Sequence, residues 1–259
     1  MAPNTEQNHV NVNLTGSSSN NSRQLDSIRD KALTDPRIIY PCYKSFDEFI
    51  DVETLKALDG YLIEKIQEHI AAKNEEYFLN AYRLDADSPH QPGAREIWLS
   101  RPKQADAVAV EDVYDELDKT EIWELTAEAC KFSLLVDFIK TLPFKATGRM
   151  LIIYDDAATS VPAHRDHLDT DVCHEFVWFR TNLKKPFYML NHQSNEKKYV
   201  ETYTAWFDAV NQFHGTDPVD GLSFSIRVDG RFTDEFRKRI PIPEYNLASM
   251  PALWASDFI

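Results

Sequence analysis

The sequence predicts an α+β protein, with helices in the first half of the chain and an antiparallel β-sandwich or barrel in the second. Before residue 143, apolar residues recur at intervals of three and four, which is the period of an amphipathic helix. After residue 143 they form short runs rich in β-branched and aromatic side chains, separated by Asp, Asn, Gly and Pro. We expect the helices to pack on the outside of the larger sheet.

The chain begins with a polar segment. Residues 1–24 are rich in Asn and Ser and have few bulky apolar groups, which is the composition of a disordered tail. Residues 25–259 are expected to form a single domain. Its parts are a helical N-terminal region over 25–145, a β-rich core over 146–240 and a C-terminal segment over 241–259 that Pro residues interrupt.

Two helical blocks are expected in the N-terminal region. The first follows Ser45, and Gly60 is a point at which it can bend or divide. The second spans 108–142 and ends before a proline. Between the blocks, residues 75–84 and 95–101 read as strands around a loop that contains Pro and Gly.

Short apolar runs predict the strands of the core. They are RMLIIY, EFVWFRTNL, PFYML, YVETYTAWF and LSFSIRV. Runs of this length between turn residues are typical of antiparallel sandwiches and barrels.

Composition and charge exclude some classes of partner. Apolar residues make up 43% of the 259 residues, enough for a substantial core. The 42 acidic residues outnumber the 28 basic ones, for a net charge of −14. Nucleic acids and anionic membranes favour a cationic surface, so neither is expected as a partner. A small-molecule substrate is expected instead, and the oligomeric state stays open.

The cysteines and the N-terminus indicate the compartment. Cys42, Cys130 and Cys173 are widely spaced and form no CxxC pair, so neither a disulfide framework nor a thiolate zinc site is indicated. The sequence shows no signal-peptide h-region and no apolar run long enough to cross a membrane. We therefore expect a cytoplasmic protein.

A group of metal-ligand residues lies in the β-rich half. His164 and Asp166 stand two apart, so in an extended chain both side chains project from the same face. With His214 from far along the chain, two imidazoles and a carboxylate can occupy one face of an octahedral metal and leave its other positions open. That is the facial triad of non-haem Fe(II) oxygenases. His167 and His174 are the competing local ligands.

An arginine in the last predicted strand suggests an anion site. Strand alternation sends Ser223, Ser225 and Arg227 to one face. An inward-facing Arg requires an anionic partner, because leaving a buried charge unpaired is costly. That partner is either a bound carboxylate or a buried ion pair with Asp or Glu. Arg231 and Arg237 are the alternatives if the register is shifted.

Residues 148–232 resemble the Fe(II)/2-oxoglutarate-dependent dioxygenases, and look closest to the group of aspartyl/asparaginyl β-hydroxylases and bacterial proline hydroxylases. The residues that carry the resemblance are His164-x-Asp166, Arg180 in FRTNL, His214 after AWFD, and Arg227 in SFSIRVDG. The first 145 residues carry no resemblance of this kind.

The resemblance implies a double-stranded β-helix (a jelly-roll or cupin-like core) over 146–240, inside a single dioxygenase domain. It implies Fe(II) bound by His164, Asp166 and His214, with 2-oxoglutarate and O2 as co-substrates. Arg227, helped by Ser225, would bind the distal (C5) carboxylate of 2-oxoglutarate. The implied reaction hydroxylates an unactivated C–H bond and releases succinate and CO2.

The resemblance also suggests residues for the substrate. Arg180 would bind a carboxylate of the co-substrate or the substrate, although Asn182 stands where the family pattern has His. Tyr154, Trp178 and Tyr188 are expected to line the pocket. Trp98 and Arg95, from a strand beside a loop, are further candidates for substrate contact.

The resulting prediction is a hydroxylase of a small carboxylate-bearing substrate, such as a free amino acid or a derivative. A carboxylate at Asp166 favours hydroxylation over halogenation, because halogenating relatives carry a small residue there. One alternative is hydroxylation of Asp or Asn in a peptide or protein. Another is a non-oxygenase cupin-type metalloprotein, which would not need Arg227. The last alternative is a binding protein without catalytic activity, and the presence of all three expected metal ligands argues against it.

Overall fold

The computed structural model describes residues 43–72, 95–103, 122–156, 158, 160–164, 175–191, 195–207, 209 and 212–240. These residues form a mixed α/β structure in which every strand pairing is antiparallel. The expected tail over 1–24, the expected strand over 75–84 and the C-terminal segment over 241–259 lie outside the described residues.

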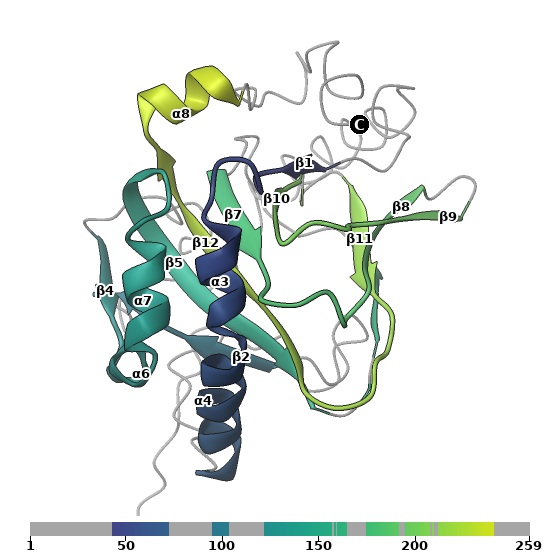
Figure 1. The fold of residues 1–259 in the computed structure, drawn as a ribbon, viewed down its shortest axis with the longest axis horizontal. Coiled ribbons are helices and arrows are strands. Elements are labelled where there is room, and N and C mark those ends of the chain that lie inside the picture. Colours follow the sequence, from purple (N-terminus) through teal and green to yellow (C-terminus); the bar gives the residue numbers. More distant parts are fainter. Residues whose placement is uncertain are drawn as a thin grey trace, which may run out of the picture.

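Before residue 144 the described elements are a mixture of helices and short strands; strands follow, and a helix comes last (Figure 1). They are β1 (Lys44–Ser45), α3 (Val52–Ala57), α4 (Asp59–Ala71), β2 (Arg95–Trp98), β3 (Ser100–Pro102), β4 (Trp123–Leu125), α6 (Ala127–Lys131), α7 (Ser133–Ile139), β5 (Phe144–Asp155), β6 (Val161–His164), β7 (Glu175–Phe179), β8 (Phe187–Asn191), β9 (Glu196–Tyr199), β10 (Thr204–Trp206), β11 (Phe213–Thr216), β12 (Ser223–Phe232) and α8 (Asp234–Arg239).

The strands form a large sheet and a smaller one. The six-stranded sheet has the order β1-β10-β7-β12-β5-β2, and the four-stranded sheet has the order β6-β11-β8-β9. β3 and β4 pair separately. From β5 onward the chain moves back and forth between the two main sheets, so residues far apart in sequence lie on facing strands.

The helix expected after Ser45 is divided, and it begins later than expected. Ser45 itself belongs to β1, and α3 starts at Val52 after Asp51, whose side chain accepts the Thr54 N–H at 3.0 Å. Such a cap satisfies an amide at the open end of a helix. α3 and α4 meet at Leu58, two residues before Gly60, so the expected division is present.

The second expected helix is partly a strand. Residues 104–121 are outside the described residues, and Trp123–Leu125 forms β4, which pairs with β3. A helix begins after Thr126, whose hydroxyl caps α6 by accepting the Ala129 N–H at 3.3 Å. The continuous helix predicted over this stretch is therefore wrong, because pairing with β3 and stacking of Trp123 on Trp98 override the local apolar spacing.

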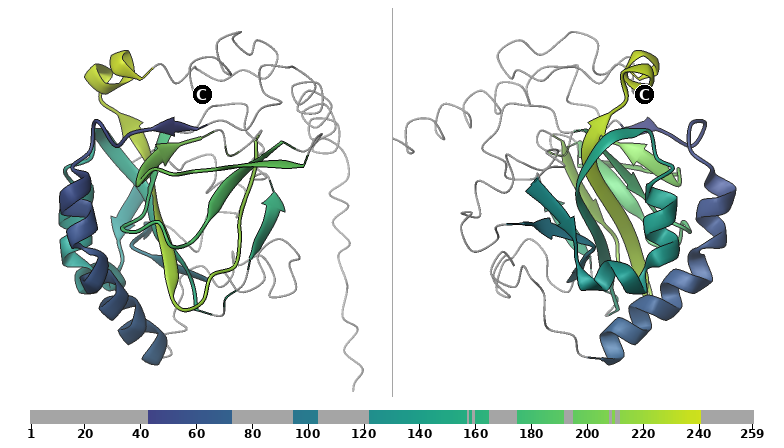
Figure 2. Two further views of the ribbon diagram at one scale, coloured as in Figure 1. Left: turned by 45° about the vertical axis from the view of Figure 1, so that its right-hand side comes forward. Right: turned by 90° about the vertical axis from the view of Figure 1, so that its left-hand side faces the viewer.

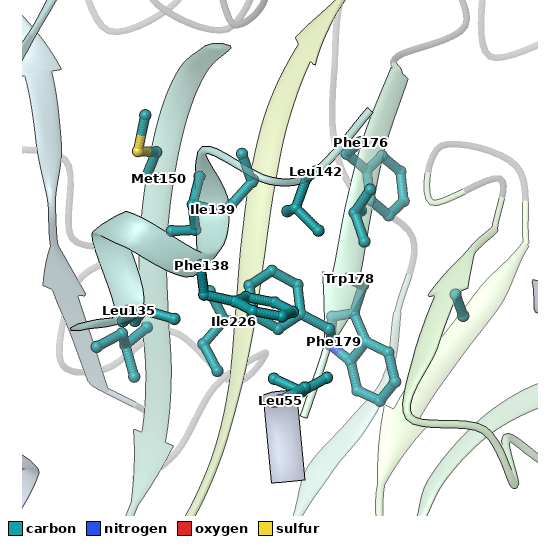
Figure 3. Close-up of a cluster of buried hydrophobic side chains, with 14 of the residues drawn as sticks. Leu55, Leu135, Phe138, Ile139, Leu142, Met150, Phe176, Trp178, Phe179 and Ile226 are labelled. Carbon is teal, nitrogen blue, oxygen red and sulfur yellow. The ribbon is translucent and has the colours of Figure 1, made fainter. Parts of the chain in front are cut away.

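Helices α3, α4, α6 and α7 cover the outer face of the six-stranded sheet, and the four-stranded sheet faces its other side (Figure 2). Leu55 of α3 and Leu135, Phe138 and Ile139 of α7 pack in one cluster with Phe179 and Ile226 of the sheet (Figure 3). Burial of this apolar surface is the main stabilising contribution to the layered arrangement. Among the described residues, no helix is long and apolar enough to span a membrane.

Strand β12 shows how the sheet separates its two faces. Ile226 lies opposite Phe179 and Ile152, on the face that the helices cover. Arg227 lies opposite Trp178 and Leu151, on the inner face. The alternation expected from SFSIRV is therefore present, and it directs polar side chains toward the space between the sheets.

Candidate metal and anion site

The two histidines that the sequence singled out are neighbours. His164 ends β6, His214 lies in β11, and the two residues are direct cross-strand partners. Their ring centroids are 4.5 Å apart, and His214 is only 6% exposed. A pair of imidazoles this close, brought together by strands distant in sequence, is a ready-made part of a metal site.

Both rings are held in the same way. Nδ1 of His164 lies 2.9 Å from the carbonyl oxygen of Pro162, and Nδ1 of His214 lies 3.0 Å from that of Gln212. A carbonyl only accepts hydrogen bonds, so Nδ1 carries the hydrogen in each neutral ring and Nε2 has the lone pair. Fixing the tautomer and orientation through the second ring nitrogen is the usual arrangement for histidine metal ligands.

The third expected ligand lies outside the described residues. Asp166 comes two residues after the end of β6, and the alternative ligands His167 and His174 are in the same segment. Within the described part of the chain, no cluster of three or more His, Cys, Asp or Glu side chains is placed to hold a metal. The described residues thus supply two imidazoles of the expected set, and their donor chemistry fits a divalent transition metal.

Aromatic side chains fill the space beside the histidines. The Phe207 and Phe187 rings lie 5.1 and 5.9 Å from the His214 ring. Phe187 in turn lies 4.6 Å from Trp178, which projects from the inner face of the large sheet. This apolar wall lowers the local dielectric and strengthens any electrostatic interaction made beside it.

Arg227 lies on that inner face and is 6% exposed. Its guanidinium carbon sits 4.0 Å from the centre of the Phe176 ring. Nε and Nη2 approach Oδ1 of Asp229 at 3.0 and 2.9 Å. Of the two anionic partners considered from the sequence, the structure therefore contains the buried ion pair. Ser225, also named as a candidate, shares the face of Arg227.

The alternative arginines are placed elsewhere. Arg237 in α8 donates to Glu175 at 2.5 and 2.8 Å, and Arg231 is an exposed residue opposite Ala146 near the end of β12. Arg227 is therefore the arginine of β12 that the fold directs into the interior.

Arg180 has a different environment from the one expected. Its Nε donates to the Thr202 carbonyl at 3.2 Å, its Nη1 to the Lys185 carbonyl at 2.8 Å, and its Nη2 to the Val200 carbonyl. Burial lowers the pKa of Arg180 to about 10, an effect that the nearby charge of Asp47 partly offsets. Because these contacts fasten two loops together, we correct the expected carboxylate-binding role to a structural one.

Asn182, which departs from the family pattern, has a structural contact as well. Its Nδ2 donates to Oδ1 of Asp59 at 2.6 Å, and the Thr181 hydroxyl donates to the same oxygen. These bonds tie the loop after β7 to the start of α4.

The three expected pocket residues separate onto different faces. Trp178 is on the inner face, beside the aromatic wall. Tyr154 lies on the helix side, with its ring 6.3 Å from that of His69 in α4. Tyr188 lies under Gly215, beside Tyr199 on the other face of the small sheet from His214. Neither tyrosine faces the histidine pair, so we retain Trp178 alone as a lining residue.

The remaining candidates lie at the edge of the large sheet. The Trp98 indole stacks on Trp123 at 6.4 Å, and Arg95 approaches Asp156 at 3.9 Å. Arg149 and Asp229, which the sequence reasoning missed, lie deeper: Arg149 Nε donates to Asp229 Oδ2 at 2.9 Å. Asp229 stands two residues after Arg227, so alternation along the strand was the available signal for it.

Comparisons with known proteins find only weak structural similarity. No protein-family model matches the chain, and no curated protein matches it. A Pseudomonas putida prolyl-4-hydroxylase is similar with a TM-score of 0.39 and 13% identity, over 81% of this chain and 100% of its own.

Two further solved structures are similar to the same degree or less. A Trichoplax adhaerens prolyl hydroxylase, bound to a peptide of the hypoxia inducible factor oxygen degradation domain, has a TM-score of 0.37 and 11% identity, over 87% of this chain and 96% of its own. A 2OG-Fe(II) oxygenase family oxidoreductase from Burkholderia pseudomallei has a TM-score of 0.29 and 13% identity, over 52% of this chain and 65% of its own. Similarity at these TM-scores establishes neither fold nor function, so the case for function rests on the residues of the site.

Proposed function

We propose that this protein is an Fe(II)- and 2-oxoglutarate-dependent oxygenase that hydroxylates an unactivated C–H bond of a small carboxylate-bearing substrate and releases succinate and CO2. The observation that carries the proposal is the cross-strand pair His164–His214, with rings 4.5 Å apart and each Nδ1 bonded to a carbonyl. Two imidazoles held in this way, with Asp166 two residues after His164 in the sequence, would supply the ligands of a facial triad.

The strand order supports the same proposal. Strands β5, β7, β10 and β12 belong to the large sheet, and β6, β8, β9 and β11 to the small one. Antiparallel strands that pass in turn between two facing sheets are the plan of a jelly roll. We therefore propose a double-stranded β-helix over residues 146–240, with the histidines on the small sheet and Arg227 on the large one.

In the proposed site each group has a separate task. His164, Asp166 and His214 would hold the metal, which when bound supplies the activation of O2 that no amino-acid side chain provides. Arg227 would bind the distal carboxylate of 2-oxoglutarate, and the Ser225 hydroxyl would add a hydrogen bond. Phe187, Phe207 and Trp178 would exclude water from the space between these groups.

Anaerobic spectroscopy tests the proposal directly. Purified protein given Fe(II) and then 2-oxoglutarate should develop a visible metal-to-ligand charge-transfer band. His214→Ala should abolish the band, because one of the two imidazoles is lost. His69→Gln is the matched control: His69 is a buried histidine that contacts Glu128 outside the site, and the band should persist. A wild-type protein that shows no band contradicts the proposal.

The principal alternative makes a different prediction. A cupin-type isomerase or hydrolase would act with Zn(II) and without 2-oxoglutarate. The contacts between Arg227 and Asp229 are compatible with that alternative, since the pair alone accounts for a buried arginine. Turnover by a zinc-loaded preparation in the absence of 2-oxoglutarate and O2 would favour the alternative over the oxygenase.

The proposal also specifies the class of substrate, a small molecule that carries a carboxylate. With Arg180 occupied by backbone carbonyls, a carboxylate on the substrate needs another partner. A panel of free amino acids, compared with peptides that contain Asp or Asn, should be screened for substrate-dependent succinate release. We expect the free amino acids to stimulate release; stimulation by the peptides alone would point to peptide or protein hydroxylation.

A further inference from the structure

The strand that carries His164 departs from regular pairing directly before that residue. His164 of β6 lies opposite His214 of β11. Val161 of β6 lies opposite Thr216 of β11, and the register shifts between the two pairs. The two β6 residues between them therefore face a single residue of β11. Two residues opposite one define a β-bulge, which bends the strand and redirects its side chains.

Pro162 lies in this bulge, and its carbonyl orients the His164 ring. Proline has no N–H, so within sheets it is confined to edge strands and bulges. The strand order places β6 at the edge of the four-stranded sheet. The Pro162 carbonyl oxygen lies 2.9 Å from Nδ1 of His164 and accepts its hydrogen. The bulge thus supplies the backbone acceptor that fixes the tautomer and direction of this imidazole.

The Thr216 hydroxyl fastens the other end of the bulge. Its Oγ1 accepts the Val161 N–H at 3.0 Å. Thr216 itself pairs with Phe187 of β8, so this acceptor belongs to a strand that has a partner on each side. The backbones also approach closely here, because a Cβ on Gly215 would lie 2.7 Å from the Val161 carbonyl oxygen. A side-chain hydroxyl therefore satisfies a strand amide at the point where the bulge interrupts the ladder.

We propose that Thr216 is a positioning residue of the metal site: its hydroxyl holds β6 in the register that sets His164 opposite His214. This inference rests on the proposed function, because the site is the one that would hold Fe(II). Thr216 acts through the Val161 amide and the Pro162 carbonyl, and it is not itself a ligand. Loss of a group that orients a histidine ligand typically weakens metal binding about 10–100-fold.

Substitutions at Thr216 can separate the hydroxyl from the shape of the side chain. Valine keeps the β-branched shape that suits a strand but has no oxygen to accept the Val161 N–H. Serine keeps the oxygen and loses the methyl group. Alanine differs from serine by that oxygen alone. A role of the hydroxyl therefore predicts that the serine variant resembles the wild type and that the valine and alanine variants do not.

Anaerobic titration of the full-length protein with Co(II) tests the inference, with the ligand-field absorption of the bound ion as the signal. Thr216→Val should weaken Co(II) binding at least about tenfold, and Thr216→Ser should stay within about threefold of the wild type. At saturating Co(II), the spectrum of Thr216→Val should also differ from that of the wild type, because a less firmly held His164 alters the coordination. A loss of stability alone would leave the spectrum of the folded protein unchanged.

Thr126→Val is the matched control. The Thr126 hydroxyl donates to the Trp98 carbonyl at 2.7 Å and accepts the Ala129 N–H at the start of α6, outside the small sheet. Loss of this cap should lower the stability of the protein. Co(II) affinity and the Co(II) spectrum should nevertheless equal those of the wild type, because no strand that carries a histidine ligand is affected.

The outcomes that overturn the inference are specific. Wild-type affinity and spectrum in Thr216→Val would leave Thr216 a purely structural residue, and so would a loss of affinity that Thr216→Ser shares. If Thr216→Val does not fold, the serine and alanine variants decide, and equal Co(II) affinity in these two overturns the inference. If the wild-type protein binds no Co(II), the proposed metal site itself fails and this inference fails with it, which is a separate result.

Discussion

Gly215 shows how closely the backbone is packed next to the histidine pair. A Cβ at this position would lie 2.7 Å from the Tyr188 hydroxyl oxygen and 2.7 Å from the Val161 carbonyl oxygen. The residue is adjacent to His214, in the strand that pairs with both β6 and β8. The glycine is thus required by space, since its neighbours include backbone that cannot move aside cheaply.

Gly215→Ala should destabilise the protein by about 1–3 kcal/mol, the usual cost of overpacking, and should weaken metal binding because β6 and β11 are forced apart. Chemical denaturation and metal titration measure the two effects. Gly60→Ala is the matched control: a Cβ there has nothing within 4 Å, and an alanine at the second position of α4 should stabilise by about 0.4–1 kcal/mol by restricting the unfolded chain. Equal behaviour of the two variants would contradict this reading of Gly215.

Glu128 links α6 to α4 and gives the stability a dependence on pH. It lies 3.2 Å from His69 Nδ1 and 2.6 Å from Lys131 Nζ. Burial pushes the pKa of Glu128 upward, but the hydrogen bonds from Lys131 and His69 outweigh it, so the pKa lies below its ordinary value of 4.5. A carboxyl with a lowered pKa stabilises the fold above its unfolded-state pKa and loses that contribution as the pH falls through the folded-state value.

Glu128→Gln should therefore lower the free energy of unfolding near neutral pH by roughly 1 kcal/mol, and the deficit relative to wild type should shrink as the pH falls below 4.5. Denaturant titrations at several pH values measure this difference. Glu53→Gln, at an exposed pair with Lys56, should change little at any pH. A deficit that is independent of pH would show that shape, and not charge, is what Glu128 contributes.

Among the elements, α7 offers the clearest test of the helix layer. Leu135 is 0% exposed within the core cluster, whereas its neighbour Leu134 is 50% exposed. Leu135→Ala should cost about 2–5 kcal/mol, and Leu134→Ala should stay within about 0.5 kcal/mol of wild type. Thermal or chemical unfolding of both variants measures the contrast. Similar losses at the two positions would mean that α7 presents a different face to the sheet.

The elements also show what the sequence could predict. The alternation in SFSIRV predicted which face of β12 carries Arg227, because the side-chain period of a strand is fixed. FHGT, which forms β11, has no apolar run, so only pairing with β6 and β8 makes it a strand. For Trp123–Leu125, the local apolar spacing predicted a helix, but these residues form a strand that pairs with β3.

Part of the candidate site could also be predicted from the sequence. His164 and His214 were recognisable by motif and spacing, and the fold brings them together. Arg180 was misassigned because its acceptors are carbonyls of loops that only the tertiary structure brings close. Arg149 was missed because a register shift between β5 and β12 directs its side chain. Neither this shift nor the hydrogen bonds of Ser100 to the Gly148 and Met150 backbone can be inferred from the local sequence.

At the scale of the whole molecule, the order of strands along the chain differs from their order in the large sheet. β12, the last strand that the structure describes, lies between β5 and β7 and pairs with both. The helix layer contacts the same strands, as the packing of Ile226 against α7 illustrates (Figure 3). The centre of the core is therefore built from the end of the β-rich region.

That placement matters during synthesis on the ribosome. Until residues 223–232 leave the exit tunnel, β5 and β7 each lack the strand that pairs with them, β12. The apolar side chains of the helices then lack part of the sheet surface on which they pack. Exposed edges of this kind attract other strands. We therefore expect the nascent chain to be prone to aggregation until these residues are available for pairing.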